Sequence, residues 1–177
     1  FNTKVFIKTE ADTTDGNNVR MLVNIDKGDK LKISKITFEG NEQLTDKGLR
    51  KAMKNTKQIN PIRIFKASKF VKDKYKEDLT SIVEKYKEKG YRDAELVKDT
   101  IYQYNKSRVN IKMDIYEGKK YYFGKITWAG NGIYSDDILN KVLTIQKGDI
   151  FSEDKLNKKL NGGGENGGDI NSMYTDN

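Results

Sequence analysis

Residues 29–41 read DKLKISKITFEGN, and residues 119–131 read KKYYFGKITWAGN. Six of these thirteen positions are identical, and all are separated by 90 residues. The same offset relates three further pairs: Val19 and Val109, Ile25 and Ile115, and Gly28 and Gly118. A fixed period predicts tandem copies of one small structural unit. We therefore expect the function to lie on a surface that each copy repeats.

The composition narrows the classes of function. The 177 residues carry a formal net charge of +8, with lysines interleaved among acidic residues, as in 72–78. On a helix this interleaving is typical of a solvated face with ion pairs one turn apart. The chain has neither Cys nor His, so it lacks the commonest general base and metal ligand. We predict no enzymatic activity, metal site or cofactor. The chain also lacks an apolar run of about 20 residues, the length of a membrane-spanning helix.

Residues 29–118 form one complete unit in the order strand, helix, helix, strand, strand. The expected elements are a strand at 31–39, a helix after an N-cap at Thr45, a helix at 73–89, and strands at 91–102 and 108–117. The apolar phase slips between Ile33 and Ile36, which indicates a bulge. Such a unit can bury one sheet face only beneath its helix pair, which predicts a two-layer α+β fold.

Two incomplete copies flank this unit. Residues 1–28 match 91–118 and are expected to form the closing hairpin of a preceding module. Residues 119–177 match the opening half: a strand in which Trp128 is buried, a helix capped by Ser135, and a second helix interrupted by five glycines within 162–168. The chain begins with Phe1, not Met, which indicates an excerpt of a longer protein.

These motifs resemble the polypeptide-transport-associated (POTRA) domains of BamA-type outer-membrane assembly factors. The resemblance rests on residues 36–41, their repeat at 126–131, residues 86–94, and residues 169–177. It implies tandem modules, each a three-stranded mixed sheet covered on one face by two antiparallel helices. It also implies a protein-interaction scaffold on the periplasmic side of the bacterial outer membrane. The implied partners are nascent outer-membrane proteins and accessory assembly lipoproteins.

The strand after the second helix is expected to be a sheet edge, where an extended client can pair with free backbone groups. The expected client-binding residues are Arg92, Asp93, Ala94, Glu95, Leu96, Val97, Lys98 and Asp99. The alternative is that the charges on this strand only prevent aggregation through an exposed edge.

The points where one module meets the next are expected to permit limited hinge motion. The expected joint residues are Gly28, Gly40, Asn41, Gly118, Gly130 and Asn131. The two incomplete ends could also pair between molecules as a swapped module.

Three other functions stay open at the level of sequence. The same modules occur in protein-secretion or translocation pores, and the basic charge could meet an anionic membrane surface. A nucleic-acid-binding array is a weaker alternative, because the chain lacks aromatic ribonucleoprotein motifs and a Gly-x-x-Gly clamp. We expect no nucleic-acid partner.

Overall fold

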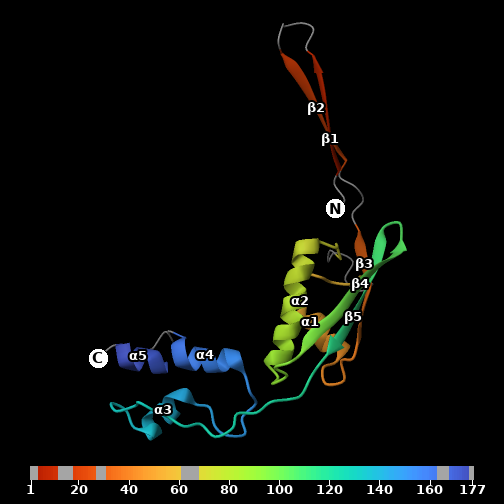
Figure 1. The fold of residues 1–177 in the computed structure, drawn as a ribbon. Coiled ribbons are helices and arrows are strands. Elements are labelled where there is room, and N and C mark those ends of the chain that lie inside the picture. Colours follow the sequence, from red (N-terminus) through yellow and green to blue (C-terminus); the bar gives the residue numbers. More distant parts are fainter. Residues whose placement is uncertain (1–3, 12–17, 27–30, 61–67, 163–167, 176–177) are drawn as a thin grey trace.

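The computed structural model describes residues 4–11, 18–26, 31–60, 68–162 and 168–175 (Figure 1). The middle of the chain follows the predicted order of strand, helix, helix, strand and strand. Its elements are β3 (Lys32–Glu39), α1 (Asp46–Ala52), α2 (Lys72–Lys87), β4 (Glu95–Asn105) and β5 (Arg108–Tyr116). Residues 53–71 form the connector between the two helices, and residues 61–67 of it lie outside the described residues.

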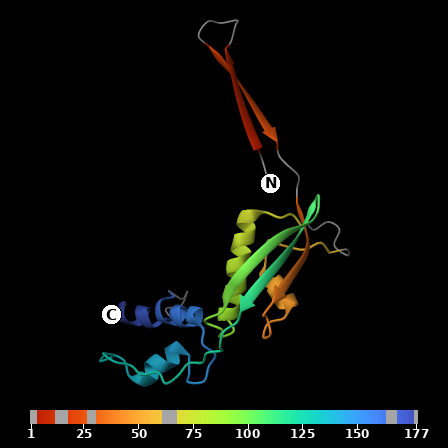
Figure 2. The same cartoon turned by 45° about the vertical axis from the view of Figure 1, so that its right-hand side comes forward.

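The three strands of the middle unit form one mixed sheet in the order β3-β5-β4. β5 is central, since it pairs with β3 in parallel and with β4 antiparallel. Both helices lie on one face of this sheet, α1 against β3 and α2 against β4 (Figures 1 and 2). The predicted architecture, a three-stranded mixed sheet beneath two helices, is confirmed.

The core lies between the sheet and the helix pair. Alternate residues of β5 face the helices, and four of them are buried: Val109, Ile111, Met113 and Ile115. Leu49 of α1 and Ile82 of α2 meet them from above, each at most 1% exposed. The strand pairing shifts by one residue between Ile33 and Lys35, which confirms the predicted bulge in β3. This bulge lets both Ile33 and Ile36 point into the core.

Local sequence signals set the ends of both helices. The Thr45 hydroxyl oxygen accepts the backbone N–H of Gly48 at 3.2 Å, which confirms the predicted N-cap of α1. The end of α2 is closed by Gly90 in the left-handed region, with φ of +92°. The Tyr91 N–H donates to the Tyr86 carbonyl at 3.1 Å, as expected for a glycine C-cap.

The amino-terminal residues form an antiparallel hairpin of β1 (Lys4–Ala11) and β2 (Val19–Asp26). Every residue of both strands is exposed. One face of the hairpin is apolar, because the register places Val5 opposite Ile25 and Ile7 opposite Val23. Shifted by 90 residues, Val23 and Ile25 correspond to buried residues of β5.

The predicted strand within 119–131 does not form. Only Tyr122 makes a β-bridge there, to Ile150. In the middle unit β3 pairs with β5, which follows the second helix. Among the described residues, no strand follows the helices within 136–175, so residues 119–131 have no equivalent partner. Trp128 is accordingly half-buried outside any strand, and its indole N–H donates to the Asn140 side chain at 2.9 Å.

Three short helices follow this segment: α3 (Asp136–Leu143), α4 (Glu153–Asn161) and α5 (Ile170–Thr175). Leu139, Leu143 and Ile145 are buried among them. The predicted capping role of Ser135 is wrong in part, because Ser135 occupies the N-cap position but its side chain makes no capping hydrogen bond. The helix interrupted by glycine resumes at α5, and residues 163–167 of the predicted loop lie outside the described residues.

Candidate functional site

The two edges of the mixed sheet differ. At the β3 edge, the N–H of Ile33 donates to the Ser68 carbonyl at 2.7 Å. The Ile33 carbonyl accepts the N–H of Ile59 at 2.8 Å. Further along, the N–H of Ile36 donates to the side-chain oxygen of Gln58 at 3.0 Å. The connector between the helices therefore satisfies outward backbone groups of β3 at Ile33 and Ile36 with atoms of its own chain.

The β4 edge is free in the part of the chain that the structure describes, since only β5 pairs with it. Its register shifts at two places, around Val97 and around Tyr104, which indicates two bulges. Both side chains are exposed, at 63% and 60%. Bulges bend an edge away from flat pairing and limit aggregation, yet they leave unpaired N–H and C=O groups between them. The segment from Lys98 to Gln103 is the regular part of this edge.

The residues predicted to bind a client divide into two groups. Glu95 to Asp99 begin β4 and belong to the free edge. Arg92 and Asp93 lie in the turn before the strand, and Ala94 is buried with 5% exposure. Within the strand, the register places Leu96 and Asp99 opposite buried residues of β5, so they are on the helix side of the sheet. Lys98 lies opposite Asp114, on the side away from the helices.

A buried tyrosine connects α2 to the free edge. The hydroxyl group of Tyr75, whose side chain is 3% exposed, donates to a carboxylate oxygen of Asp99 at 2.9 Å. Burial raises the pKa of Tyr75 far above its ordinary value, and the hydrogen bond to the Asp99 carboxylate raises it further. The neutral hydroxyl therefore remains a donor, and it holds α2 directly above β4.

Arg92 and Asp93 make contacts with the segment that follows the middle unit. The hydroxyl group of Tyr121 donates to Asp93 at 2.6 Å, and the guanidinium of Arg92 lies 5.9 Å from the centre of the Phe151 ring. Beside them, the backbone N–H of Tyr121 donates to the Gly90 carbonyl at 2.9 Å. A Cβ atom at Gly90 would lie 2.7 Å from a side-chain carbon of Ile150. We call these residues the Gly90 joint: Gly90, Arg92, Asp93, Tyr121, Ile150 and Phe151.

Two of the predicted joint glycines lie close to this region. Gly40 has φ of +80°, and a Cβ there would lie 2.1 Å from the Ile115 carbonyl oxygen, so only glycine fits. A Cβ at Gly118 would lie 3.2 Å from the Cβ of Asp93. Between them, the buried carboxylate of Glu117 accepts the N–H of Gln43 at 2.9 Å and the Tyr86 hydroxyl at 2.8 Å. Glu117 thus ties the Gly40 turn to α2.

The predicted Asn41 and Asn131 have the same local role in both copies. The Asn41 side-chain amide donates to the Leu44 carbonyl at 2.9 Å and to Asp46 at 3.0 Å. The Asn131 amide donates to Tyr134 at 3.0 Å and to Asp136 at 2.8 Å. Each asparagine therefore fixes the chain entering a helix. No described atom lies within 4 Å of a Cβ built at the adjacent Gly130, and Gly28 lies outside the described residues.

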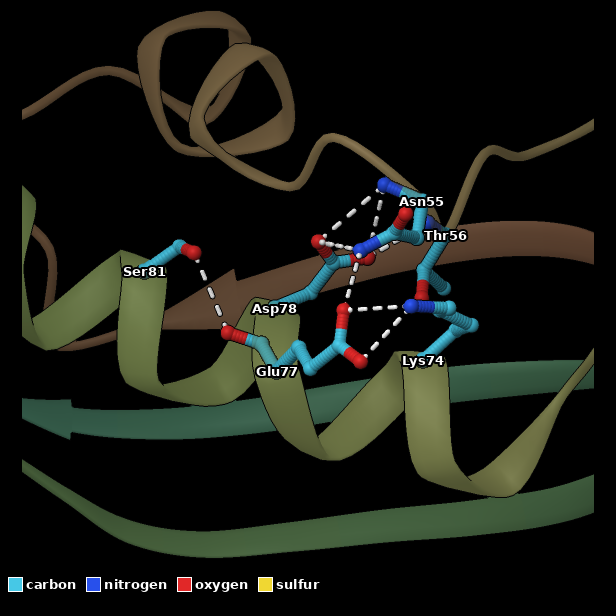
Figure 3. Close-up of polar contacts among 6 residues, drawn as sticks. All are labelled: Asn55, Thr56, Lys74, Glu77, Asp78 and Ser81. Atoms are coloured by element: carbon cyan, nitrogen blue, oxygen red, sulfur yellow. Dashed lines mark hydrogen bonds and ion pairs between the residues drawn. The ribbon is translucent and has the colours of Figure 1, made fainter.

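One buried carboxylate corrects the prediction of a solvated face at 72–78. Asp78 is 0% exposed, and its oxygens accept the backbone N–H groups of Asn55, at 3.1 Å, and of Thr56 (Figure 3). Glu77 next to it is exposed and pairs with Lys74 at 2.7 Å. Asp78 therefore fastens the chain leaving α1 to α2. Its spacing from Tyr75 and Ile82 along one helix face was the signal available in the sequence.

Sequence reasoning also missed Glu117 and the Gly90 joint. Glu117 continues the alternation of β5 on its buried face, which marks it as an inward-facing charge. The joint brings together residues about 30 and 60 positions apart, through a segment that pairs with no strand among the described residues. Among the described residues, no helix has the length and apolar character needed to cross a membrane.

The family model described as POTRA, surface antigen variable number repeat, matches residues 31–118 and again 121–162. The outer membrane protein assembly factor BamA of Neisseria meningitidis serogroup B is 28% identical over 148 residues, covering 81% of this chain and 18% of the relative. A putative outer membrane protein assembly factor of Treponema pallidum is 26% identical over 153 residues, covering 84% of this chain and 18% of that protein.

A solved structure of POTRA domains 3–5 of Haemophilus influenzae BamA also aligns with the chain. The TM-score is 0.47 at 12% sequence identity, over 88% of this chain and 58% of the other. The chain spans less than a fifth of the length of the curated relatives that it matches. The family model covers most of the chain in two consecutive copies, and the order of elements in the middle unit agrees with the sequence prediction. The chain therefore belongs to the POTRA family.

Proposed function

We propose that this chain is a non-catalytic docking unit to which extended polypeptide segments bind by adding a strand to β4. The observation that carries the proposal is the difference between the two sheet edges. The connector bonds to outward groups of β3 at Ile33 and Ile36, whereas β4 pairs with β5 alone among the described residues. Backbone pairing depends little on side chains, which suits clients of varied sequence.

The relatives suggest the process in which this docking takes place. Both are named as outer-membrane protein assembly factors. We therefore propose that the chain is part of a longer outer-membrane protein and lies on the periplasmic side of that membrane. Its proposed clients are nascent outer-membrane proteins and accessory assembly lipoproteins. The POTRA region of a secretion or translocation pore is the second candidate, since the family match covers the modules alone.

The test of strand addition compares two substitutions at Val97. Val97→Pro removes a backbone N–H at a bulge, where proline is tolerated, and Val97→Ala shortens the side chain but keeps the N–H. Binding of an extended peptide is followed through the amide signals of Glu95 to Asn105 and through its affinity. We expect Val97→Pro to weaken peptide binding about tenfold, because at least one backbone hydrogen bond is lost and the proline disturbs the geometry of the edge. We expect Val97→Ala to weaken peptide binding much less. Equal affinities for both variants would contradict pairing through the backbone.

We propose three modules along the chain: residues 1–28 as the closing hairpin of one, residues 29–118 as a complete module, and residues 119–177 as the opening part of another. The hairpin supports this division, since its apolar face corresponds by the 90-residue offset to the buried face of β5. We also propose that a second copy of this chain covers this face with α3 to α5. Ile138 of α3, 44% exposed, supports that pairing.

A further inference from the structure

The side of α2 that borders the free edge carries unpaired positive charge. Asp78 bonds to Asn55 and Thr56 and so marks the side of α2 that faces α1. Residues three or four positions apart share a helix face, so Lys72 and Lys76 share one face of α2. The core-facing residues separate this face from the side that carries Asp78. Since α2 lies over β4 and α1 over β3, these two lysines lie on the side of the free edge. We call Lys72 and Lys76 the basic pair.

The basic pair is not neutralised by its own helix. In the described part of the chain, the ion pairs of α2 join Lys74 to Glu77, Lys85 to Glu88 and Lys87 to Glu84. None of them includes Lys72 or Lys76, and both side chains are exposed. The acidic residues of α2 lie mainly on the solvent face, away from β4. Positive charge is therefore concentrated where α2 meets the edge.

Beneath the basic pair, β4 presents one carboxylate and two apolar side chains. Tyr75 lies between Lys72 and Lys76 along α2. Its hydrogen bond to Asp99 therefore places both lysines close to the middle of β4. Asp99 is the carboxylate on the helix side of this part of the strand, and it already accepts the Tyr75 hydroxyl. Val97 and Ile101 on either side are 63% and 40% exposed. Two ammonium groups facing one engaged carboxylate leave the border net positive.

The spacing of the basic pair matches the spacing of an added strand. Four residues of helix advance about 6 Å. Two residues of strand advance about 6.6 Å, and they point to the same face. Carboxylates at positions i and i+2 of a strand added to β4 would therefore stand opposite Lys72 and Lys76 together. Carboxylates at i and i+3 would point to opposite faces, and only one could meet the pair.

We propose that the basic pair selects, among extended polypeptides that add to β4, those with acidic side chains at alternate positions on the face toward α2. The occupant is a polypeptide strand with carboxylates at i and i+2 beside apolar residues, which meet Val97 and Ile101. This inference rests on the proposed function, because it assigns a preference to the same edge. The preference is electrostatic, so it weakens as salt shortens the range of the charges.

Two synthetic peptides of one composition test the preference. One carries glutamates at i and i+2 in a Val/Thr-rich sequence, and the other carries them at i and i+3. Their affinities for the full 177-residue chain are measured at low salt, together with the amide shifts of β4. We expect the first peptide to bind roughly fivefold more tightly, because an exposed ion pair contributes a factor of a few.

Two double variants separate the basic pair from charge in general. Lys72→Gln with Lys76→Gln removes the pair, and we expect it to abolish the preference while β4 amides still shift. Lys74→Gln with Lys85→Gln removes the same charge from lysines already paired on the other side of α2, and we expect it to keep the preference. Loss of the preference in both double variants would show a general charge effect and overturn the proposal.

The remaining outcomes are distinguishable. Amide shifts along β4 without a preference in the wild-type chain would leave strand addition standing and overturn the selection by charge. Absence of any shift along β4 would overturn both. A parallel experiment uses vesicles of phosphatidylcholine and phosphatidylglycerol. If the Lys72/Lys76 variant loses vesicle binding and the wild-type chain shows no peptide preference, the pair is a lipid contact and the proposal is wrong.

Discussion

The hydroxyl group of Tyr121 donates a hydrogen bond of 2.6 Å to Asp93, although the two residues are 28 positions apart. Asp93 precedes the free edge strand, and Tyr121 opens the segment after the middle unit. Together with the bond from the Tyr121 N–H to the Gly90 carbonyl, this contact places the joint beside the amino end of β4. The free edge strand and the segment after the middle unit therefore share one turn of the chain.

The Gly90 joint depends on the absence of a side chain at position 90. We expect Gly90→Ala to separate the two segments, because its Cβ would approach Ile150 to 2.7 Å and the Tyr121 carbonyl to 3.1 Å. Gly148→Ala is the matched control, since Gly148 has the same φ of +92° but no described atom lies within 4 Å of the position of its Cβ. Both variants should lose about 1 kcal/mol from left-handed backbone strain. Only Gly90→Ala should remove nuclear Overhauser contacts between position 90 and Ile150.

The buried carboxylate of Asp78 should dominate the stability of the helix pair. Asp78→Ala leaves the N–H group of buried Thr56 without its acceptor and removes the acceptor of the exposed Asn55 N–H group (Figure 3). We expect the free energy of unfolding in urea to fall by about 3 kcal/mol. Glu77→Ala, which removes only an exposed partner of Lys74, should cost less than about 0.5 kcal/mol. Similar losses for both variants would contradict this account.

The stability of the middle unit should fall at high pH. Burial, followed by the hydrogen bond to the Glu117 carboxylate, raises the pKa of Tyr86 well above its ordinary value of 10. Above pH 10 an unfolded tyrosine loses its proton while folded Tyr86 keeps it, so the unfolded state binds fewer protons and stability decreases as pH rises. Below pH 10 the contribution is fully present. We expect Tyr86→Phe to flatten this decrease by up to about 1.4 kcal/mol per pH unit, measured by urea unfolding at several pH values. An unchanged slope would show that Tyr86 does not control it.

The apolar face of the β1–β2 hairpin should drive self-association of this chain. Val23, 47% exposed, lies on that face, and Leu22, 53% exposed, lies on the other. We expect light scattering to detect dimers at high concentration, Val23→Lys to remove them, and Leu22→Lys to leave them. A monomeric mass for the unsubstituted chain at every concentration would contradict the swapped pairing.

Periodicity was sufficient to predict the middle unit. The i, i+4, i+7 spacing of Tyr75, Leu79 and Ile82 predicted α2, and the alternation from Val109 to Ile115 predicted β5. These patterns succeed because each reports a face that the element buries against its own neighbours. The Gly90 C-cap was predictable for a similar reason, since the left-handed conformation is local.

Features that depend on distant partners escaped prediction. Residues 119–131 carry the strand signature of β3, but a strand forms only where another strand pairs with it. Asp78 resembled the charged residues around it, because a sequence of alternating charges does not reveal which carboxylate meets buried N–H groups. Arg92 and Asp93 were expected on the edge strand, and they lie instead in the turn that contacts Tyr121 and Phe151.

The hydrogen bonds that join Gln58, Ile59 and Ser68 to Ile33 and Ile36 bear on how many strands the module can take up. A sheet with two open borders could take up two ligands and propagate into a chain of modules linked side by side. Because the connector bonds to β3 at Ile33 and Ile36, the proposed mode of docking leaves β4 as the border that takes up a strand. Under the proposed mode of docking, the number of strands that a tandem array can hold at once then equals the number of its modules.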